Sequence, residues 1–169
     1  MYQGEEKPIL EYLRGVRMNE ISIKQAVDYA ASRALGTYFN ERYPEYPKFT
    51  SVITKDNLSA NIAEAICAIV GRPTKLGMEV LHALQLLLDN KVRPENSKYA
   101  SYYLQQLKAL PEGHVINYSD VMVSRNGHYY VDKKFGFEEV WMSVILTALV
   151  YGGHCILVAG DDRKYDAGN

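Results

Sequence analysis

Four histidines are the side chains best suited to bind a metal, and their spacing argues against a metal site. His82, His114, His128 and His154 lie far apart, with no HxxxH, HxH or Cys–His pairing among them. Protein metal sites usually draw their ligands from closely spaced pairs of this kind. We therefore expect no metal and no cofactor in this chain, and we interpret the histidines as surface or core-edge residues.

Two segments contain residue types that occur in nucleotide-binding sites. Gly71-Arg-Pro-Thr-Lys75 has the residue types of a phosphate-binding loop, but it lacks the second glycine before the lysine and follows no predicted strand. Ile156–Asp162 is an apolar strand with an acidic end, as in sites that hold magnesium beside a nucleotide, yet no phosphate loop accompanies it. We interpret the first as a helix–helix turn and the second as an exposed turn.

Nucleophilic catalysis is not indicated either. The sequence has no Gly-x-Ser-x-Gly motif, and no serine or cysteine can be paired with a base from its position along the chain. We therefore predict that this chain is not an enzyme and has no catalytic residues.

Four basic residues could contact DNA phosphates or an acidic partner. Lys133 and Lys134 precede the long apolar segment 135–158, and Arg163 and Lys164 follow it. In a winged helix, loops at such positions contact phosphates. However, a helix that reads bases must expose polar side chains, whereas residues 140–151 offer mainly a serine and a threonine. Protein contact needs fewer assumptions, and DNA binding stays open as the alternative.

The segment 135–158 is predicted to be a helix, a glycine turn and a strand. Glu138 and Glu139 suit a helix N-terminus, and Gly152 with Gly153 suits its end. The apolar residues between them follow helical spacing, so we expect one strongly buried face with further apolar groups around it. The run 155–159 reads as a short strand. The predicted buried face consists of Trp141, Val144, Ile145, Ala148 and Leu149.

Helical patterns occupy most of the chain before this segment. Residues 1–21 are predicted to be weakly ordered, with a short helix over 8–18 that is interrupted at Gly15. A capping box at Ser22 and Gln25 starts a helix to about Arg42. A proline-stiffened connector covers 43–49, and further helices are predicted from 54 to 71, from 73 to about 90, and from 97 to 110. The apolar face of the helix to Arg42 is Ile23, Val27, Ala30, Ala34, Leu35 and Tyr38.

Residues 114–131 allow two interpretations. A short strand over 115–117 with a brief helix over 120–123 is one of them, and a hairpin that pairs 121–124 with 128–131 through Asn126-Gly127 is the other. We predict a mostly α (α+β) fold: a helical bundle over 22–110, then a winged-helix-like part over 111–169 with a small β-sheet. The two parts are expected to form one compact unit.

Composition adds few constraints. The net charge of −1 and the pI near 6.4 give no overall basic field that would favour nucleic acid. The longest apolar run, 140–150, is too short to cross a membrane, and no signal peptide is recognisable. Cys67 and Cys155 show no CxxC pattern, so we expect reduced thiols and a cytoplasmic protein.

Several segments of the chain together carry a family resemblance: 41–49, 135–141, 146–153 and 165–167, with 77–88 and 97–100 between them. They resemble an internal region of the large P-loop ATPase-like proteins of bacteriophage-exclusion (BREX) systems, the PglY-like group. The resemblance implies a segment of a much larger phage-defence protein whose nucleotide-binding motifs, and therefore ATP, lie outside this region. Its implied partners are other parts of that protein and other defence-system proteins, or DNA, with no membrane.

From these observations we expect a non-catalytic interaction module of a phage-defence ATPase that makes protein or DNA contacts. A winged-helix DNA-binding domain is the first alternative, and a small independent enzyme is the second. Lys133, Lys134, Arg163 and Lys164 are the candidate contact residues.

Overall fold

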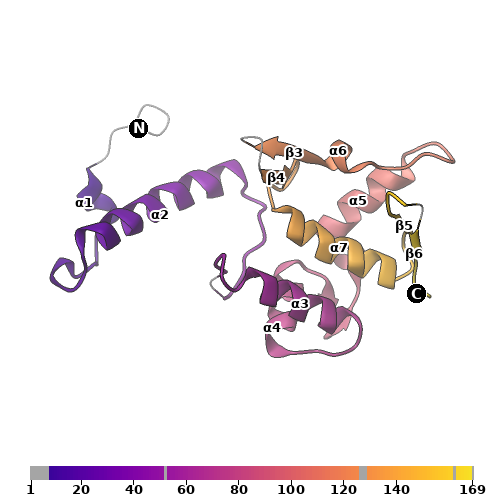
Figure 1. Ribbon diagram of the computed structural model, residues 1–169, viewed down its shortest axis with the longest axis horizontal. Helices are drawn as coiled ribbons and strands as arrows, with labels where there is room; N and C mark the ends of the chain where they lie inside the picture. Colours follow the sequence, from indigo (N-terminus) through magenta and orange to yellow (C-terminus); the bar gives the residue numbers. More distant parts are fainter. Residues whose placement is uncertain (1–7, 52, 126–128, 162, 169) are drawn as a thin grey trace. The chain divides into compact units, whose positions relative to one another are not determined.

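The computed structural model describes residues 8–51, 53–125, 129–161 and 163–168 (Figure 1). The chain forms two compact units, one up to Tyr46 and one from Pro47 onward. The boundary expected at residues 110/111 falls inside the second unit. The segment 1–7, the Asn126-Gly127 turn, His128 and Asp162, on which some sequence predictions rest, lie outside the described residues.

The first unit is built around one long helix. It contains α1 (Ile9–Tyr12), a 3-10 turn η1 (Met18–Glu20) and α2 (Ile23–Arg42). The predicted capping box is confirmed: the Ser22 hydroxyl accepts from the Gln25 backbone N–H at 3.2 Å, and the Ser22 N–H donates to Gln25 Oε1 at 2.8 Å. Gly15, at φ 83°, follows α1 in the left-handed conformation, so the predicted interruption is also confirmed.

The predicted buried face of α2 is wrong for its large apolar residues. Ile23 is 86% exposed and Leu35 is 65% exposed. Ala30 is buried as predicted, and it packs with Ala26, which was not predicted, against Leu13. The helix α1 has only one turn, so it covers a narrow strip of α2. The larger apolar side chains of α2 therefore stay at the surface of this unit.

The second unit is organised around α7 (Glu139–Tyr151), as Figure 1 shows. The helix α7 contacts α3 (Leu58–Ile69) and α5 (Lys98–Lys108), and α3 also packs on α4 (Lys75–Ala83). All five residues of the predicted buried face of α7 are buried, together with Ile69, Leu81, Leu84 and Tyr99 from the other helices. The ring of Phe49 packs on that of Trp141, with 4.6 Å between the ring centroids, and so links the connector to this core.

Most helix ends in this unit follow capping rules, and two of them differ from the prediction. Gly71 and Gly153 close α3 and α7 in the left-handed conformation, as predicted. The helix predicted to reach Asn90 instead ends at Ala83, because Gln85 adopts φ 57° and the Leu86 N–H donates to the Leu81 carbonyl. The helix α3 starts at Leu58 rather than near Thr54, whose N–H donates to Asn57 Oδ1.

After α4 the chain forms a small hairpin in place of more helix. Strand β1 (Leu87–Leu88) pairs with β2 (Lys91–Val92). Asp89 and Asn90 both have positive φ, 49° and 59°, which suits a two-residue hairpin turn. A short 3-10 turn η2 (Pro94–Asn96) then leads to α5, whose predicted cap Ser97 accepts from the Ala100 N–H.

Residues 114–132 combine parts of both interpretations. The hairpin is confirmed: β3 (Met122–Arg125) pairs antiparallel with β4 (Tyr129–Asp132), with Val123 opposite Val131. A one-turn helix α6 (Tyr118–Val121) precedes it, two residues earlier than predicted. The strand predicted over 115–117 is absent, and these residues are irregular.

The last hairpin joins β5 (Leu157–Val158) to β6 (Lys164–Tyr165). The described strands thus form three separate two-stranded antiparallel sheets. The fold is mostly α with a little β, as predicted. The winged-helix arrangement is not confirmed, because β5 and β6 pair only with each other among the described strands, whereas a wing shares its sheet with a strand that precedes the helix.

Candidate functional site

Lys133 and Lys134 lie in the turn between β4 and α7. The Lys133 ammonium donates to the backbone carbonyls of Ser119 and Asp120 at 2.8 and 2.9 Å, at the end of α6. The Lys134 ammonium is 5.9 Å from the centre of the Phe135 ring. Both side chains are exposed, yet much of the hydrogen-bonding capacity of Lys133 is used to hold α6 against this turn.

A buried carboxylate shapes the turn that carries these lysines. Asp132 is 1% exposed, and its two oxygens accept hydrogen bonds from the Tyr103 hydroxyl and the Phe135 backbone N–H. Burial, followed by the hydrogen bond to Asp132, raises the pKa of the Tyr103 hydroxyl, so Tyr103 stays a donor. Because both carboxylate oxygens are used within the fold, we assign this group a structural role.

Arg163 and Lys164 lie on the other hairpin. Arg163 Nε donates to Asp161 Oδ2 at 2.6 Å, and Lys164 is on β6. Figure 1 shows β4 at the start of α7 and the β5–β6 hairpin near its end. Since α7 has 13 residues, it is about 20 Å long. The structure therefore places the four candidate residues in two pairs, near opposite ends of one helix.

The β5–β6 hairpin exposes more apolar surface than the sequence suggested. The predicted strand over 155–159 is short, and Ile156, Leu157 and Val158 are 60%, 43% and 51% exposed. Tyr165, opposite Leu157 in the register, is also exposed. We call Ile156, Leu157, Val158 and Tyr165 the hairpin patch. Sequence reasoning predicted an exposed turn over residues 156–162 but did not predict an apolar patch on the strand, because an apolar strand after a buried helix usually enters the core.

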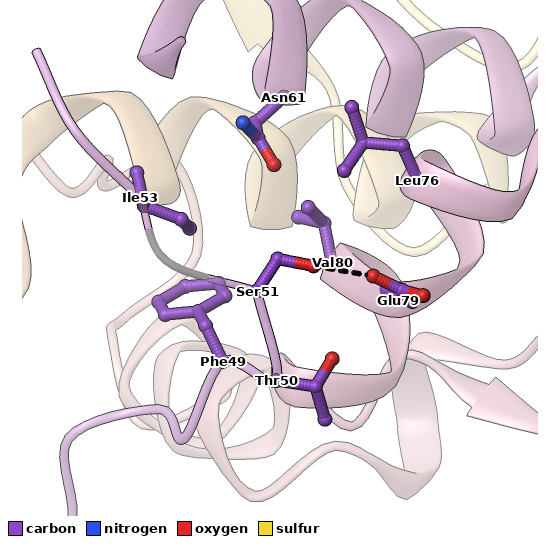
Figure 2. Close-up of a pocket in the computed structure, with 8 residues that line it drawn as sticks. All are labelled: Phe49, Thr50, Ser51, Ile53, Asn61, Leu76, Glu79 and Val80. Atoms are coloured by element: carbon purple, nitrogen blue, oxygen red, sulfur yellow. Dashed lines mark hydrogen bonds between the residues drawn. The ribbon is translucent and has the colours of Figure 1, made fainter.

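A tight pocket lies between the connector after Phe49 and helices α3 and α4 (Figure 2). The Ser51 hydroxyl donates to Glu79 Oε2 at 2.5 Å, and the side chain of Asn61, 2% exposed, lies on the α3 side. Asn61 Nδ2 donates to the Asn57 carbonyl at 2.8 Å, whereas Asn61 Oδ1 accepts no hydrogen bond from the described residues. The space has no room for a water molecule, so it cannot admit a substrate beside Ser51.

Sequence reasoning had no means of finding the Ser51–Glu79 pair. The two residues are 28 positions apart and belong to no motif. A carboxylate can orient a hydroxyl, but a serine nucleophile also needs access to its substrate. We therefore regard this contact as a link between the connector and α4.

The remaining candidate chemistry is accounted for by local structure. Thr74 caps α4 by accepting from the Gly77 N–H, so residues 71–75 form the helix–helix turn predicted for them. His154 pairs with Glu95 at 3.3 Å, and both cysteines are free. In the part of the chain that the structure describes, no three His, Cys, Asp or Glu residues are grouped so that they could hold a metal.

Comparison with known families assigns most of this unit. Residues 58–169 match the model described as "Family of unknown function (DUF6079) 4th domain". The chain belongs to this DUF6079 family. The match runs from the start of α3 onward, so the DUF6079 domain contains α7, both candidate basic pairs and the hairpin patch.

Other comparisons of this DUF6079 chain gave no match. A search of curated proteins found no significant similarity, and neither did a search of solved structures. Since the family has no assigned function, the resemblance to BREX proteins stays a hypothesis. None of the described helices is long and apolar enough to cross a membrane.

Proposed function

We propose that this DUF6079 domain is a non-catalytic interaction module of a BREX-type phage-defence protein. Its contacts are made with neighbouring domains of the same protein or with other defence proteins. The observation that carries the proposal is the exposure of the hairpin patch: Ile156, which precedes β5, and Leu157 and Val158, which form β5, are all exposed apolar residues.

The hairpin patch has the properties of a surface that a partner covers. Ile156 directly precedes β5, and because side chains alternate between the two faces of a strand, Leu157 and Val158 lie on opposite faces. All three are exposed, and Leu157 pairs with exposed Tyr165. An isolated two-stranded hairpin is only marginally stable in water, and exposed apolar patches mark contact sites. The family model describes a fourth domain, which favours a neighbouring domain as the partner.

Support for the non-catalytic part comes from the way polar groups are used. The Asp132 carboxylate holds the turn before α7, and the Ser51 hydroxyl links the connector to Glu79. Lys133 closes the end of α6. In each of these clusters the polar groups bond to the backbone or to neighbouring side chains of the same unit, which supports a structural role.

The geometry favours protein contact over the reading of DNA bases. On α7 the Ser143 and Thr147 hydroxyls donate to the Glu139 and Ser143 carbonyls, so both bond within their own helix. The opposite face of α7 is buried against α3 and α5. A recognition helix must instead offer free donors and acceptors to base edges.

The hairpin patch can be tested with two matched variants. The first, Ile156→Ser with Val158→Ser, changes the patch. The second, Val115→Ser with Leu88→Ser, changes apolar residues that are similarly exposed elsewhere in the second unit. Binding of each to separately produced neighbouring domains of a DUF6079 protein is measured by biolayer interferometry. We expect only the patch variant to lose affinity, and equal affinities would contradict the proposal.

The two alternatives have direct tests. Calorimetric titration with Mg-ATP and a phosphate-release assay should show neither micromolar affinity nor turnover, and either result would overturn the non-catalytic assignment. Anisotropy with a labelled DNA duplex tests the winged-helix alternative. Affinity that falls steeply with salt, and weakens when Lys133, Lys134, Arg163 and Lys164 are all changed to alanine, would favour DNA as the partner.

A further inference from the structure

A second hollow, separate from the hairpin patch, lies where the connector after Pro47, α4 and the β1–β2 hairpin meet. Its volume is about 450 Å³, within the range of about 300–1,000 Å³ that is usual for ligand sites. We call it the α4 groove. Three basic side chains, Lys48, Lys75 and His82, line it together with the apolar side chains of Met78, Ala83 and Leu87.

The two lysines of the α4 groove are not neutralised by neighbours. Lys48 and Lys75 are exposed, and neither ammonium makes a hydrogen bond or ion pair with any described residue. Glu79 is the one carboxylate in the lining, and its Oε2 is occupied by the Ser51 hydroxyl. Two lysines against one carboxylate leave the groove positive at neutral pH.

The apolar part of the groove restricts what this charge can attract. Met78 and Leu87 are half-buried and Ala83 is 9% exposed, so they offer a partly covered apolar surface between the basic side chains. A methionine adapts its shape to varied apolar groups. Among the described residues, the lining contains no Phe, Tyr or Trp ring on which a base could stack and no arginine that could bind a phosphate with two hydrogen bonds. These features fit a peptide better than a nucleic acid.

We propose that the α4 groove binds an acidic peptide segment of a partner protein, in which glutamate or aspartate alternates with aliphatic residues. The carboxylates of the peptide pair with Lys48 and Lys75, and its aliphatic side chains pack on Met78 and Leu87. This site shares no residue with the hairpin patch, so either proposal can fail without the other.

The test uses the whole chain and a short fluorescent peptide of alternating Glu and Leu residues, with binding followed by anisotropy. We expect binding that weakens with salt and falls on the order of tenfold in the Lys48→Glu, Lys75→Glu variant. The control variant, Lys24→Glu with Lys108→Glu, makes the same change of charge at exposed lysines outside the groove and should bind like the unmodified chain.

Changes in the peptide test the apolar contribution without altering the protein. A Glu–Ser peptide of equal length should bind more weakly than the Glu–Leu peptide, and a Lys–Leu peptide should not bind. Absence of Glu–Leu binding, equal weakening in both lysine variants, or tighter binding of a single-stranded oligonucleotide at the same lysines would each overturn the proposal.

Discussion

The Tyr103 hydroxyl donates a hydrogen bond to the buried Asp132 carboxylate and thereby joins α5 to the turn between β4 and α7. The other carboxylate oxygen accepts the Phe135 N–H, and the Asp132 N–H donates to the Phe137 carbonyl. Phe135 and Phe137 pack on Tyr99 of α5. This single acidic residue therefore sets the path of the chain into α7, on which the core of the second unit is built.

Removing the Tyr103 hydroxyl should destabilise the chain. In Tyr103→Phe the ring stays, but one oxygen of a buried carboxylate loses its donor, which costs about 1–3 kcal/mol of unfolding free energy. Urea denaturation, monitored by circular dichroism, measures this difference in unfolding free energy. Tyr102→Phe is the matched control: its ring contacts the same cluster, and its hydroxyl makes no hydrogen bond with the described residues. A similar loss in both variants would contradict the assigned role.

The difference between wild type and Tyr103→Phe should also depend on pH. Folding raises the pKa of Tyr103, so its contribution is complete at neutral pH and is lost as pH rises above the ordinary tyrosine value near 10, where the unfolded chain ionises. We expect a constant stability difference from about pH 7 to 9 and a smaller one above about pH 10. A stability difference between wild type and Tyr103→Phe that grows with pH would contradict this prediction.

Gly77 should not tolerate a methyl group, although it lies inside a helix. A Cβ there would meet the Glu64 backbone carbonyl oxygen at 2.2 Å, because α4 crosses α3 closely at this point. We expect Gly77→Ala to lower the unfolding free energy by about 1–3 kcal/mol, as overpacked sites do. Gly36→Ala in α2 is the control, since no atom lies within 4 Å of its added Cβ. It should be neutral or stabilising by up to about 1 kcal/mol. Thermal unfolding compares the two.

Elements with local signals were predictable, and those that depend on distant partners were not. The Ser22 and Ser97 caps, the Gly71 and Gly153 ends and the buried face of α7 follow from neighbouring residues. The end of α4 was missed because the apolar pattern continues through Leu88, while Gln85 supplies the left-handed turn that glycine usually provides. The Asp132–Tyr103 pair spans 29 positions and leaves no local trace.

The candidate contact residues show the same division. The sequence placed two basic pairs on either side of α7, and the structure keeps them there. The sequence could not show that Lys133 bonds to the end of α6, or that Lys48 and Lys75 line the same groove. Both facts depend on how separate elements pack.

Cys155 should react slowly with thiol reagents. Burial raises the pKa of its thiol, so a smaller share is thiolate near neutral pH. In a Cys67→Ser variant, where Cys155 is the remaining cysteine, we expect iodoacetamide to react more slowly with the folded chain than with the chain in urea. The rate should rise as the pH increases. Equal rates in the two states at neutral pH would contradict a protected thiol.

Asn61 should be replaceable by leucine at little cost. Its Oδ1 is buried and accepts no hydrogen bond from the described residues, and a buried acceptor without a donor lowers the stability of the folded chain. The Asn57 carbonyl keeps its bond from the Asn61 backbone N–H at 3.0 Å when the side chain is changed. Leucine has the same branching, so we expect the unfolding free energy of Asn61→Leu to stay within about 1 kcal/mol of wild type.

Asn61→Asp is the contrasting variant at this position. It has the same shape but places a carboxylate among Phe49, Ile53 and Leu76, where it has no cationic partner among the described residues. We expect Asn61→Asp to lower the unfolding free energy by more than about 2 kcal/mol at neutral pH. The loss should be smaller at acid pH, where the carboxylate is protonated. Urea denaturation of both variants measures these changes, and a large loss of unfolding free energy in Asn61→Leu would contradict the assignment of Oδ1 as an acceptor without a donor among the described residues.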